Sequence, residues 1–328
     1  MKTKLSICIP TYNRSKFLIE CLDSVLQSIV GYENQIEIII SDNASTDETR
    51  EVVADIIRTY PWIIYNRNDV NIGAERNFYK LATLAIGDYI WILGDDDKLK
   101  KEAIANIINR IDLGYNLLIA NYSTWTKDLS TLRKYAGINI HQDRVFVEPD
   151  ELMKCFGLHL GYISSVIIYK HIFLKTSSDK FESYSDYGFS FLYVVYAGIA
   201  SHCHANFIAA PIVINRSDNY GNFDWWKYFI IGTSLVFEEL AVEKYSKNAM
   251  ISAKHQVLKD AVIPHILSLS VKEEGNARWS RISLMLHHYN RNWLFWVVCL
   301  PVLLMPTFIA RIGKKLVCII RGVRQLSP

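Results

Sequence analysis

The chain has 328 residues, half of them apolar and 21% charged, and its formal net charge is +3. This size and composition allow one large or two modest domains with a buried core, and they exclude a generally disordered chain. The small net charge does not indicate a nucleic-acid-binding protein, so we expect no nucleic-acid partner. Six scattered cysteines without a Cys-x-x-Cys pair exclude a zinc or disulfide framework and favour a reducing compartment, and we expect no signal peptide.

Short apolar runs alternate with helical patterns over the first 120 residues. Apolar residues spaced by three and four predict helices over residues 17–26 and 103–111, and the capping-box pattern Ser45-Thr46-Asp47-Glu48 predicts the start of another over residues 52–57. Such alternation predicts an α/β fold in which helices cover both faces of a mainly parallel sheet. The predicted strands are Leu5–Ile9, Ile36–Ile40, Trp62–Tyr65, Tyr89–Leu93 and Leu117–Ala120.

Three of these strands end in polar segments, namely residues 10–14, 41–43 and 94–97. In a parallel sheet all three lie on one edge, where ligands of such sheets bind. The segment Gly94-Asp95-Asp96-Asp97 places three adjacent carboxylates there, whose repulsion requires water or a cation. Hard oxygen ligands select Mg²⁺ or Mn²⁺, and an ion at this position is suited to hold a diphosphate. A solvated acidic turn is the alternative.

The second half of the chain is less regular. We expect strands at Val166–Tyr169 and Ala210–Asn215, an apolar helix at Phe189–Tyr196, and helices over residues 222–290. No Asp or Glu follows Glu274, so the remainder carries +8 and the first 274 residues carry −5. The sequence therefore predicts an acidic body with a basic end.

Residues Trp293 to Ala310 form an uncharged stretch of 18 residues between Arg291 and Arg311. This length is at the lower limit for crossing a bilayer, and two prolines interrupt it. Basic flanks and the tryptophans suit a membrane interface. We expect association with a membrane surface or shallow insertion, with a full span or a buried helix as alternatives.

Four motifs in register carry a resemblance to a known family. They are Ile9-Pro10-Thr11-Tyr12-Asn13-Arg14, residues 41–47 (Ser-Asp-Asn-Ala-Ser-Thr-Asp), residues 71–77 (Asn-Ile-Gly-Ala-Glu-Arg-Asn) and residues 87–97, which end in Gly-Asp-Asp-Asp. Together they resemble the family 2 glycosyltransferases with the GT-A fold, and in particular bacterial O-antigen or polysaccharide sugar transferases of the abequosyltransferase-like branch. The resemblance implies a GT-A catalytic domain at 1–215, with a nucleotide-sugar half (1–120) and an acceptor half (121–215). A helical extension at 216–290 and a membrane-associating tail at 291–328 would follow.

The resemblance also implies a donor-nucleotide site. Tyr12 would pack on the base, and Asp42 would accept a hydrogen bond from a base with a ring N–H, such as uracil, thymine or guanine. Arg76 would hold phosphate or ribose oxygens. The alternatives are core packing for Tyr12, a turn or helix cap for Asp42, and a surface ion pair for Arg76. The full expected set is Pro10, Thr11, Tyr12, Arg14, Asp42, Asn71, Gly73, Arg76, Asp95 and Asp96.

The expected metal ligands are Asp97 and Asp95, holding Mn²⁺ or Mg²⁺ as a Lewis acid for the departing nucleoside diphosphate. Enzymes of this family invert the anomeric centre, so the acceptor hydroxyl requires a general base. Asp186, with Glu182 in reserve, is the candidate, and a helix N-cap is the alternative role for Asp186. Tyr162, Ser164 and Ser165 would shape the acceptor pocket or form an ordinary turn.

The resulting expectation is an inverting, metal-dependent glycosyltransferase at the cytoplasmic face of the inner membrane. It would transfer sugar from a nucleotide-diphosphate donor to a saccharide acceptor linked to polyprenyl diphosphate. The main alternative is a non-catalytic, membrane-tethered module that binds sugar nucleotides or carbohydrate. A phosphatase fits less well because Leu99 stands where Thr or Val is usual, and a pyrophosphorylase would need glycines after the first strand.

Overall fold

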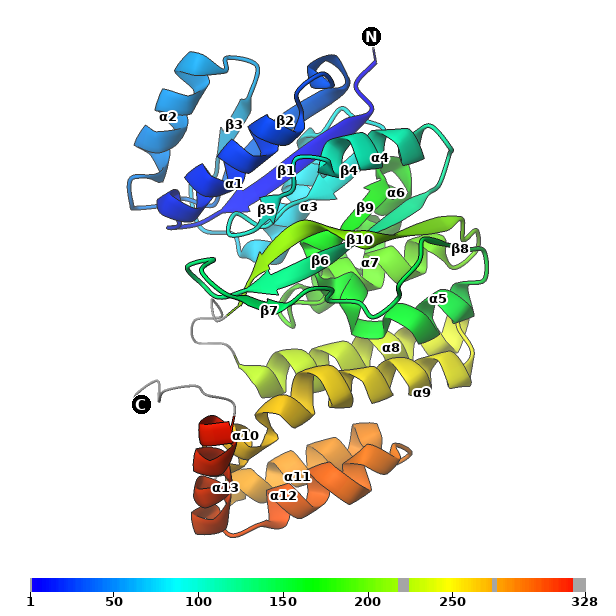
Figure 1. Cartoon of the computed structure of the whole chain (residues 1–328). Coiled ribbons are helices and arrows are strands. Elements are labelled where there is room, and N and C mark those ends of the chain that lie inside the picture. Colours follow the sequence, from blue (N-terminus) through cyan, green and yellow to red (C-terminus); the bar gives the residue numbers. More distant parts are fainter. Residues whose placement is uncertain (1, 218–223, 273–275, 321–328) are drawn as a thin grey trace. The chain divides into compact units, whose positions relative to one another are not determined.

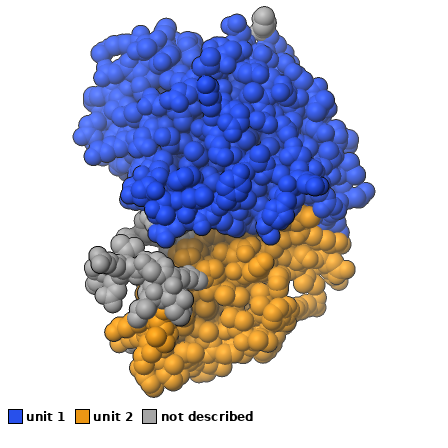
Figure 2. Space-filling model, in the orientation of Figure 1, with its two compact units in different colours: residues 1–152, 159–223 blue, residues 153–158, 224–328 orange. Residues whose placement is uncertain are grey.

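The computed structural model describes residues 2–217, 224–272 and 276–320. The chain divides into two compact units, unit 1 (1–152 and 159–223) and unit 2 (153–158 and 224–328), which Figure 2 distinguishes by colour. The end of the basic tail, with Arg321 and Arg324, lies outside the described residues.

The described strands of unit 1 form a ten-stranded mixed sheet in the order β3-β2-β1-β4-β9-β6-β10-β5, with β7 beside β6 and β8 beside β10. The strands β3, β2, β1 and β4 pair in parallel, whereas β9 is antiparallel to both of its neighbours. Strands β1 and β2 are buried along nearly their whole length, which explains their continuous apolar runs. The strands are β1 (Leu5–Thr11), β2 (Ile36–Asp42), β3 (Ile64–Arg67), β4 (Tyr89–Ile92), β5 (Lys98–Leu99), β6 (Leu117–Trp125), β7 (Leu132–Lys134), β8 (Arg144–Phe146), β9 (Val166–Tyr169) and β10 (Ala205–Arg216).

Helices cover both faces of the parallel half of this sheet (Figure 1). Ile7 and Ile9 of β1 pack with Leu18 and Leu22 of α1, whereas Cys8 points to the other face and approaches the carbonyl oxygen of Leu81 in α3. The alternation of side chains along β1 therefore joins the sheet to both helical layers. The helices are α1 (Ser15–Ser28), α2 (Thr49–Thr59), α3 (Ala74–Leu84), α4 (Ala103–Ile111), α5 (Pro149–Phe156), α6 (Lys170–Ser185) and α7 (Ser190–Ile199).

Two details of the first half differ from expectation. Strand β3 begins at Ile64 rather than Trp62, because Trp62 is exposed in the preceding turn. The expected capping box at Ser45 is also wrong. The carboxylate of Asp47 instead accepts hydrogen bonds from the backbone N–H of Thr49, at the start of α2, and of Ser15, at the start of α1, both at 3.1 Å. A single aspartate thus ties together the beginnings of two helices.

Unit 2 is helical. Its buried side chains include Phe237, Ala253, Met285, Tyr289 and Phe295. The helical segments are η4 (Trp226–Gly232), α8 (Thr233–Glu243), α9 (Lys247–Gln256), η5 (Val257–Val262), η6 (Ile263–His265), α10 (Ile266–Lys272), α11 (Asn276–Tyr289), η7 (Phe295–Cys299), α12 (Leu300–Leu304) and α13 (Thr307–Ile320).

The uncharged stretch predicted from the sequence is a broken helix. Among the described residues, no single helix has the length and hydropathy needed to cross a membrane. The segments Phe295–Leu304 and Thr307–Leu316 pass that test only as a pair, and the chain bends by 114° between them. Pro306, which precedes α13, lies at the break.

Candidate active site

The polar ends of the parallel strands meet at one edge of the sheet, as predicted. Thr11 at the end of β1 lies opposite Asp42 at the end of β2, and Asp42 lies opposite Arg67 at the end of β3. On the other side of β1, the backbone N–H of Leu93 donates to the carbonyl of Cys8 at 2.9 Å and leads the chain into the three aspartates. The register of the sheet therefore brings together residues that are up to 86 positions apart in the sequence.

A pocket of about 420 Å³ opens at this edge. Tyr12 is 43% exposed at the pocket, so its ring is available to a ligand rather than buried in the core. Most of the expected donor-site residues line the pocket, although Asp42 and Arg76 do not. The lining residues that were not predicted as site residues are Asn43, Ala74, Asn77, Phe78, Gly94 and Ile163. The complete lining is Pro10, Thr11, Tyr12, Arg14, Asn43, Asn71, Gly73, Ala74, Asn77, Phe78, Gly94, Asp95, Asp96 and Ile163.

Asp95 is buried beneath the pocket by residues of the first strand and its loop. The hydroxyl of Thr11 donates to Oδ2 of Asp95 at 2.7 Å, and one nitrogen of Arg14 lies 3.1 Å from Oδ1. Burial raises the pKa of Asp95 to about 6, and the guanidinium of Arg14 opposes that shift. Residues of the first sequence motif thus hold Asp95, the first of the three adjacent aspartates.

Asp97 is not among the residues that line the pocket, and it is held by the second half of unit 1. Tyr162 and Ser164 donate hydroxyl hydrogen bonds to its Oδ2 at 2.7 and 2.5 Å, and the amide of Asn215 donates to Oδ1 at 3.4 Å. Burial raises the pKa of Asp97 to about 7, and the nearby charge of Asp96 adds to the shift. Asp97 therefore connects the parallel half of the sheet to the loop before β9 and the end of β10.

Asp96 lies between these two carboxylates and is less buried. The same nitrogen of Arg14 that bonds Asp95 lies 3.1 Å from Oδ2 of Asp96. The backbone carbonyl of Asp96 accepts a hydrogen bond of 2.8 Å from Nε of Arg216, a buried arginine whose other nitrogens pair with Glu20 and with the carbonyl of Lys127. Arg216 was not predicted as a site residue, yet it fixes the backbone of the acidic turn.

The acidic turn fits a divalent cation in part. Asp95 and Asp96 present oxygen ligands at the pocket, which suit Mg²⁺ or Mn²⁺, and Arg14 already places one positive nitrogen between them. Asp97, the ligand expected from the sequence, instead directs its oxygens at Tyr162, Ser164 and Asn215. Over the described ranges, no three His, Cys, Asp or Glu side chains are grouped to hold a metal ion. Asp95 and Asp96 therefore fit an ion that competes with Arg14, and ligation by Asp97 stays a prediction.

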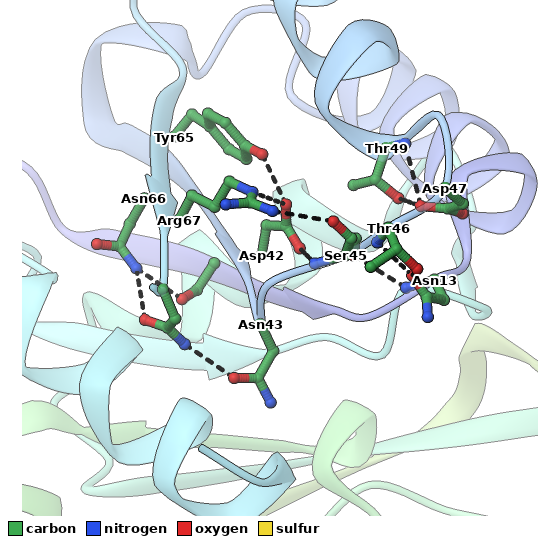
Figure 3. A network of polar contacts seen from close by, with 12 residues as sticks. Asn13, Asp42, Asn43, Ser45, Thr46, Asp47, Thr49, Tyr65, Asn66 and Arg67 are labelled. Carbon is green, nitrogen blue, oxygen red and sulfur yellow. Dashed lines mark hydrogen bonds and ion pairs between the residues drawn. The ribbon is translucent and has the colours of Figure 1, made fainter. Parts of the chain in front are cut away.

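Asp42 is fully buried at the end of β2 (Figure 3). Its Oδ1 accepts from the backbone N–H of Ser45 at 2.8 Å, and its Oδ2 accepts from the hydroxyl of Tyr65 at 2.7 Å and lies 3.3 Å from Nε of Arg67. The carboxylate thus organises the turn after β2, which includes Ala44 at a left-handed φ of 65°. Its expected contact with a nucleotide base stays a prediction.

A network of asparagines connects this turn to the pocket. The side-chain carbonyl of Asn43 accepts from Asn68 and from the backbone N–H of Ile72, both at 3.0 Å, while its amide donates to Asn71 at 2.8 Å. Asn71 in turn accepts from the backbone N–H of Gly73 at 2.9 Å. Gly73, at a φ of +86°, precedes α3, where a side chain would be strained. The network therefore fixes the loop that leads into α3.

Arg76 and Glu182, both predicted as site residues, form an ion pair. Nη2 of Arg76 on α3 lies 2.7 Å from Oε2 of Glu182 on α6, and both side chains are exposed. Asp186 lies just after α6 and is also exposed, close enough to add to the negative potential at Arg76. Neither acidic residue lines the pocket, and Asp186 is not the N-cap of α7, which is Phe189. The general base therefore stays a prediction.

The residues expected to shape the acceptor pocket have structural contacts. Ser164 and Ser165 are fully buried. Ser164 accepts from the backbone N–H of Gly94 at 2.9 Å while donating to Asp97, and Ser165 donates to the carbonyl of Tyr162 at 2.9 Å. These contacts fix the acidic turn, and a direct contact with an acceptor stays a prediction.

Comparison with known proteins agrees with this architecture. The model of the family described as "Glycosyl transferase family 2" matches residues 6–167. The abequosyltransferase RfbV of Salmonella typhimurium is 33% identical over 263 residues, which cover 74% of this chain and 76% of that protein. A GalNAc(5)-diNAcBac-PP-undecaprenol beta-1,3-glucosyltransferase of Campylobacter jejuni is 28% identical over 156 residues, covering 47% and 49%.

Solved structures show the same fold at low sequence identity. TarS 1–349 of S. aureus, in complex with UDP-GlcNAc, superimposes with a TM-score of 0.61 at 14% identity and covers 88% of this chain and 81% of that one. The mannosyltransferase PcManGT of Pyrobaculum calidifontis, in complex with GDP-Man and Mn²⁺, gives a TM-score of 0.56 at 13% identity and covers 96% and 88%. The chain belongs to glycosyltransferase family 2 and has the GT-A fold, so it is a glycosyltransferase.

Proposed function

We propose that the protein transfers a sugar from a nucleoside-diphosphate donor to a saccharide acceptor, with inversion at the anomeric carbon, in the synthesis of a bacterial surface polysaccharide. The observation that carries the proposal is the pocket in which Tyr12, Arg14, Asp95 and Asp96 converge. These residues offer a nucleotide an exposed aromatic ring, a guanidinium for phosphate oxygens and a pair of carboxylates for a cation. The named activities of the two relatives, an abequosyltransferase and a glucosyltransferase, support the polysaccharide assignment.

In this proposal each side chain has a distinct role. Tyr12 stacks on the base, and Arg14 moves its positive charge from the aspartates to the donor phosphates. A divalent ion held by Asp95 and Asp96, with Asp97 as the further ligand predicted from the sequence, would supply Lewis-acid stabilisation of charge on the departing diphosphate. Asp186 accepts the proton of the attacking acceptor hydroxyl, with Glu182 as the alternative base.

The acceptor is a saccharide on a lipid carrier, and the reaction takes place at the cytoplasmic face of the inner membrane. Support comes from the relative whose name includes PP-undecaprenol and from the basic, apolar segments of unit 2. Docking at the membrane would raise the effective concentration of such an acceptor.

A panel of UDP-, dTDP-, GDP- and CDP-sugars, with and without Mn²⁺, tests the donor site by thermal shift. We expect one nucleotide class to stabilise the protein, and to stabilise it more when Mn²⁺ is present. Release of nucleoside diphosphate in the presence of acceptor then separates an enzyme from a module that only binds. The absence of any stabilising nucleotide would contradict the proposal.

A further inference from the structure

Unit 2 contains a cationic pocket that the donor site does not use. It has a volume of about 420 Å³ and lies between α9, η5 and the turn that joins α11 to η7. The basic side chains among its lining are Lys154, Lys259 and Arg291, and none of its lining residues is acidic. We call it the tail pocket, and its lining is Lys154, Ile251, Ser252, His255, Gln256, Lys259, Arg291, Asn292 and Trp293.

The charges of the tail pocket are not neutralised from within the part of the chain that the structure describes. Lys259 and Arg291 are both exposed, and neither forms an ion pair with a described residue. An adjacent pocket of about 260 Å³, which Arg291 and Asn292 also line, differs because it contains the carboxylate of Glu238, which both Lys254 and His288 contact. The tail pocket is therefore the one suited to an anion.

Asn292 adds an unsatisfied donor. Asn292 is buried, with only 5% of the residue exposed, and its amide nitrogen has no hydrogen-bond partner among the described residues. The amide oxygen accepts from the backbone N–H of Leu294 at 3.1 Å and contacts Nδ1 of His255 at 3.3 Å. A buried donor without an acceptor costs about 1–3 kcal/mol, which is the situation that a bound anionic oxygen would relieve.

An exposed apolar stripe begins at the tail pocket. Trp293 lines the pocket and is 61% exposed, and Trp296, Val297 and Leu304 follow at helical spacing, each about half exposed or more. A second exposed apolar stripe lies on α13, where Phe308, Ile312 and Leu316 are spaced by four residues and so share one face of the helix. Exposed apolar stripes beside basic residues are typical of helices that lie in a membrane interface.

We propose that the tail pocket binds the diphosphate group of a polyprenyl diphosphate lipid, with the prenyl chain lying along the stripe that starts at Trp293. The proposal rests on the proposed function, because this lipid would carry the saccharide acceptor. The diphosphate of such a lipid carries about two negative charges when a saccharide is attached and about three when it is free, and its oxygens match three basic side chains and the amide donor of Asn292. A phosphodiester headgroup of an ordinary phospholipid carries one charge and offers fewer oxygens to the same residues.

The test compares two kinds of vesicle in flotation assays on the full chain. Phosphatidylcholine vesicles contain either polyprenyl diphosphate or phosphatidylglycerol, matched for surface charge. We expect the unaltered protein to bind the diphosphate vesicles about tenfold more tightly, a difference of about 1.4 kcal/mol. Inorganic pyrophosphate in solution should compete for the diphosphate vesicles alone.

The variant K259Q/R291Q removes two charges from the tail pocket, and K314Q/K315Q removes two charges from α13 as a matched control. We expect K259Q/R291Q to lose the tenfold preference, and we expect K314Q/K315Q to keep it while binding both vesicles more weakly. Asn292→Asp keeps the oxygen acceptor for Leu294 and replaces the amide donor, and it should lose the preference as well. Retention of the preference by K259Q/R291Q, or its absence in the unaltered protein, would overturn the proposal.

Release of nucleoside diphosphate by the unaltered protein is measured in parallel with a lipid-free saccharide acceptor. That assay reports on the proposed function alone, because it contains no lipid. Turnover without a lipid preference would overturn the proposal that the tail pocket binds lipid diphosphate and would leave the proposed transferase activity supported. A lipid preference without turnover on any nucleotide sugar would support the lipid site and contradict the proposed transferase activity.

Discussion

The hydroxyl of Tyr162 donates a hydrogen bond of 2.7 Å to Oδ2 of Asp97. This contact joins the loop before β9 to the acidic turn after β4, although 65 residues separate the two partners. Asp97 is buried, and its pKa is raised to about 7. Each hydrogen bond donated to its carboxylate therefore increases the fraction of Asp97 that is ionised at neutral pH. Tyr162 therefore acts on the acidic turn from the second half of unit 1.

Replacement of Tyr162 by Phe tests this relationship. The pKa of Asp97 should rise further in Tyr162→Phe, and Mn²⁺-dependent donor binding at pH 7 should weaken several-fold, at a cost of about 1 kcal/mol. Titration calorimetry at pH 7 and pH 8.5 checks this, since the defect should shrink at the higher pH. Tyr122→Phe is the matched control, because Tyr122 packs on Tyr162 with ring centroids 4.6 Å apart and its hydroxyl lies 3.3 Å from Nδ1 of His159.

Asp97→Asn should abolish metal-dependent turnover and leave the fold intact. We expect at least about a 100-fold loss in the release of nucleoside diphosphate, typical of the loss of charge stabilisation in a transition state. Circular dichroism and thermal unfolding report on the fold. Asp112→Asn, which changes an exposed aspartate that pairs with Lys4, serves as the control. Turnover by Asp97→Asn near the normal rate would show that Asp97 has no part in the chemistry.

Asp186→Asn should spare donor binding and remove transfer. A general base contributes about 10²- to 10⁴-fold to a reaction rate, so kcat should fall by that factor while the affinity for the nucleotide sugar stays unchanged. Glu182→Gln is the informative comparison, because it also releases Arg76 from its ion pair. If Glu182→Gln loses transfer and Asp186→Asn does not, the base assignment moves to Glu182.

The buried carboxyl group of Glu75 should make the free energy of unfolding depend on pH. It lies at the start of α3, accepts a hydrogen bond of 3.1 Å from the backbone N–H of Phe191, and is buried. Burial raises the pKa of Glu75 from 4.5 to about 7. Between these two values the folded state binds more protons than the unfolded state, so this residue lowers the free energy of unfolding as the pH rises from about 4.5 to 7.

Glu75→Gln keeps the acceptor for Phe191 and removes the buried charge. Its free energy of unfolding should therefore exceed that of the unaltered protein by about 3 kcal/mol at pH 8, and the gain should vanish near pH 4. Urea unfolding at the two pH values measures the difference. A gain that is equal at both pH values would assign the effect to packing instead of ionisation.

Much of the parallel half of the fold was predictable, because each strand there is marked by a continuous apolar run and by the polar residues that directly follow it. The apolar runs at Leu5 and Ile36 are buried on both faces, so they stand out in the sequence, and the polar residues that follow them meet at one edge by the geometry of parallel strands. Thr11, Arg14 and Asp95 lie in those polar segments, and the family resemblance implied their role in the donor site; the structure joins them by hydrogen bonds.

The contributions of β10 were not predictable in the same way. Only residues 210–215 were expected as a strand, whereas β10 runs from Ala205 to Arg216 with a register shift between Ile208 and Val213. Pro211 falls within this shift, where its missing N–H interrupts the pairing and hides the strand pattern. Asn215 and Arg216 at its end reach the acidic turn across about 120 residues of sequence, a distance over which no local pattern operates.

The orientation of the three aspartates also depended on the tertiary structure. Adjacent residues of a turn point in different directions, and the sequence does not say which one faces the pocket. The structure places Asp95 and Asp96 at the pocket and turns Asp97 toward Tyr162 and Ser164. The local spacing was sufficient to locate the turn but not to assign its ligands.

A crystal structure with Mn²⁺ and the stabilising nucleoside diphosphate, with anomalous data at the manganese edge, tests the central claim most directly. We expect an anomalous peak within bonding distance of Asp95 or Asp96 and of the diphosphate, with Arg14 displaced and the base on Tyr12. A nucleotide bound elsewhere, with no peak at the acidic turn, would contradict it.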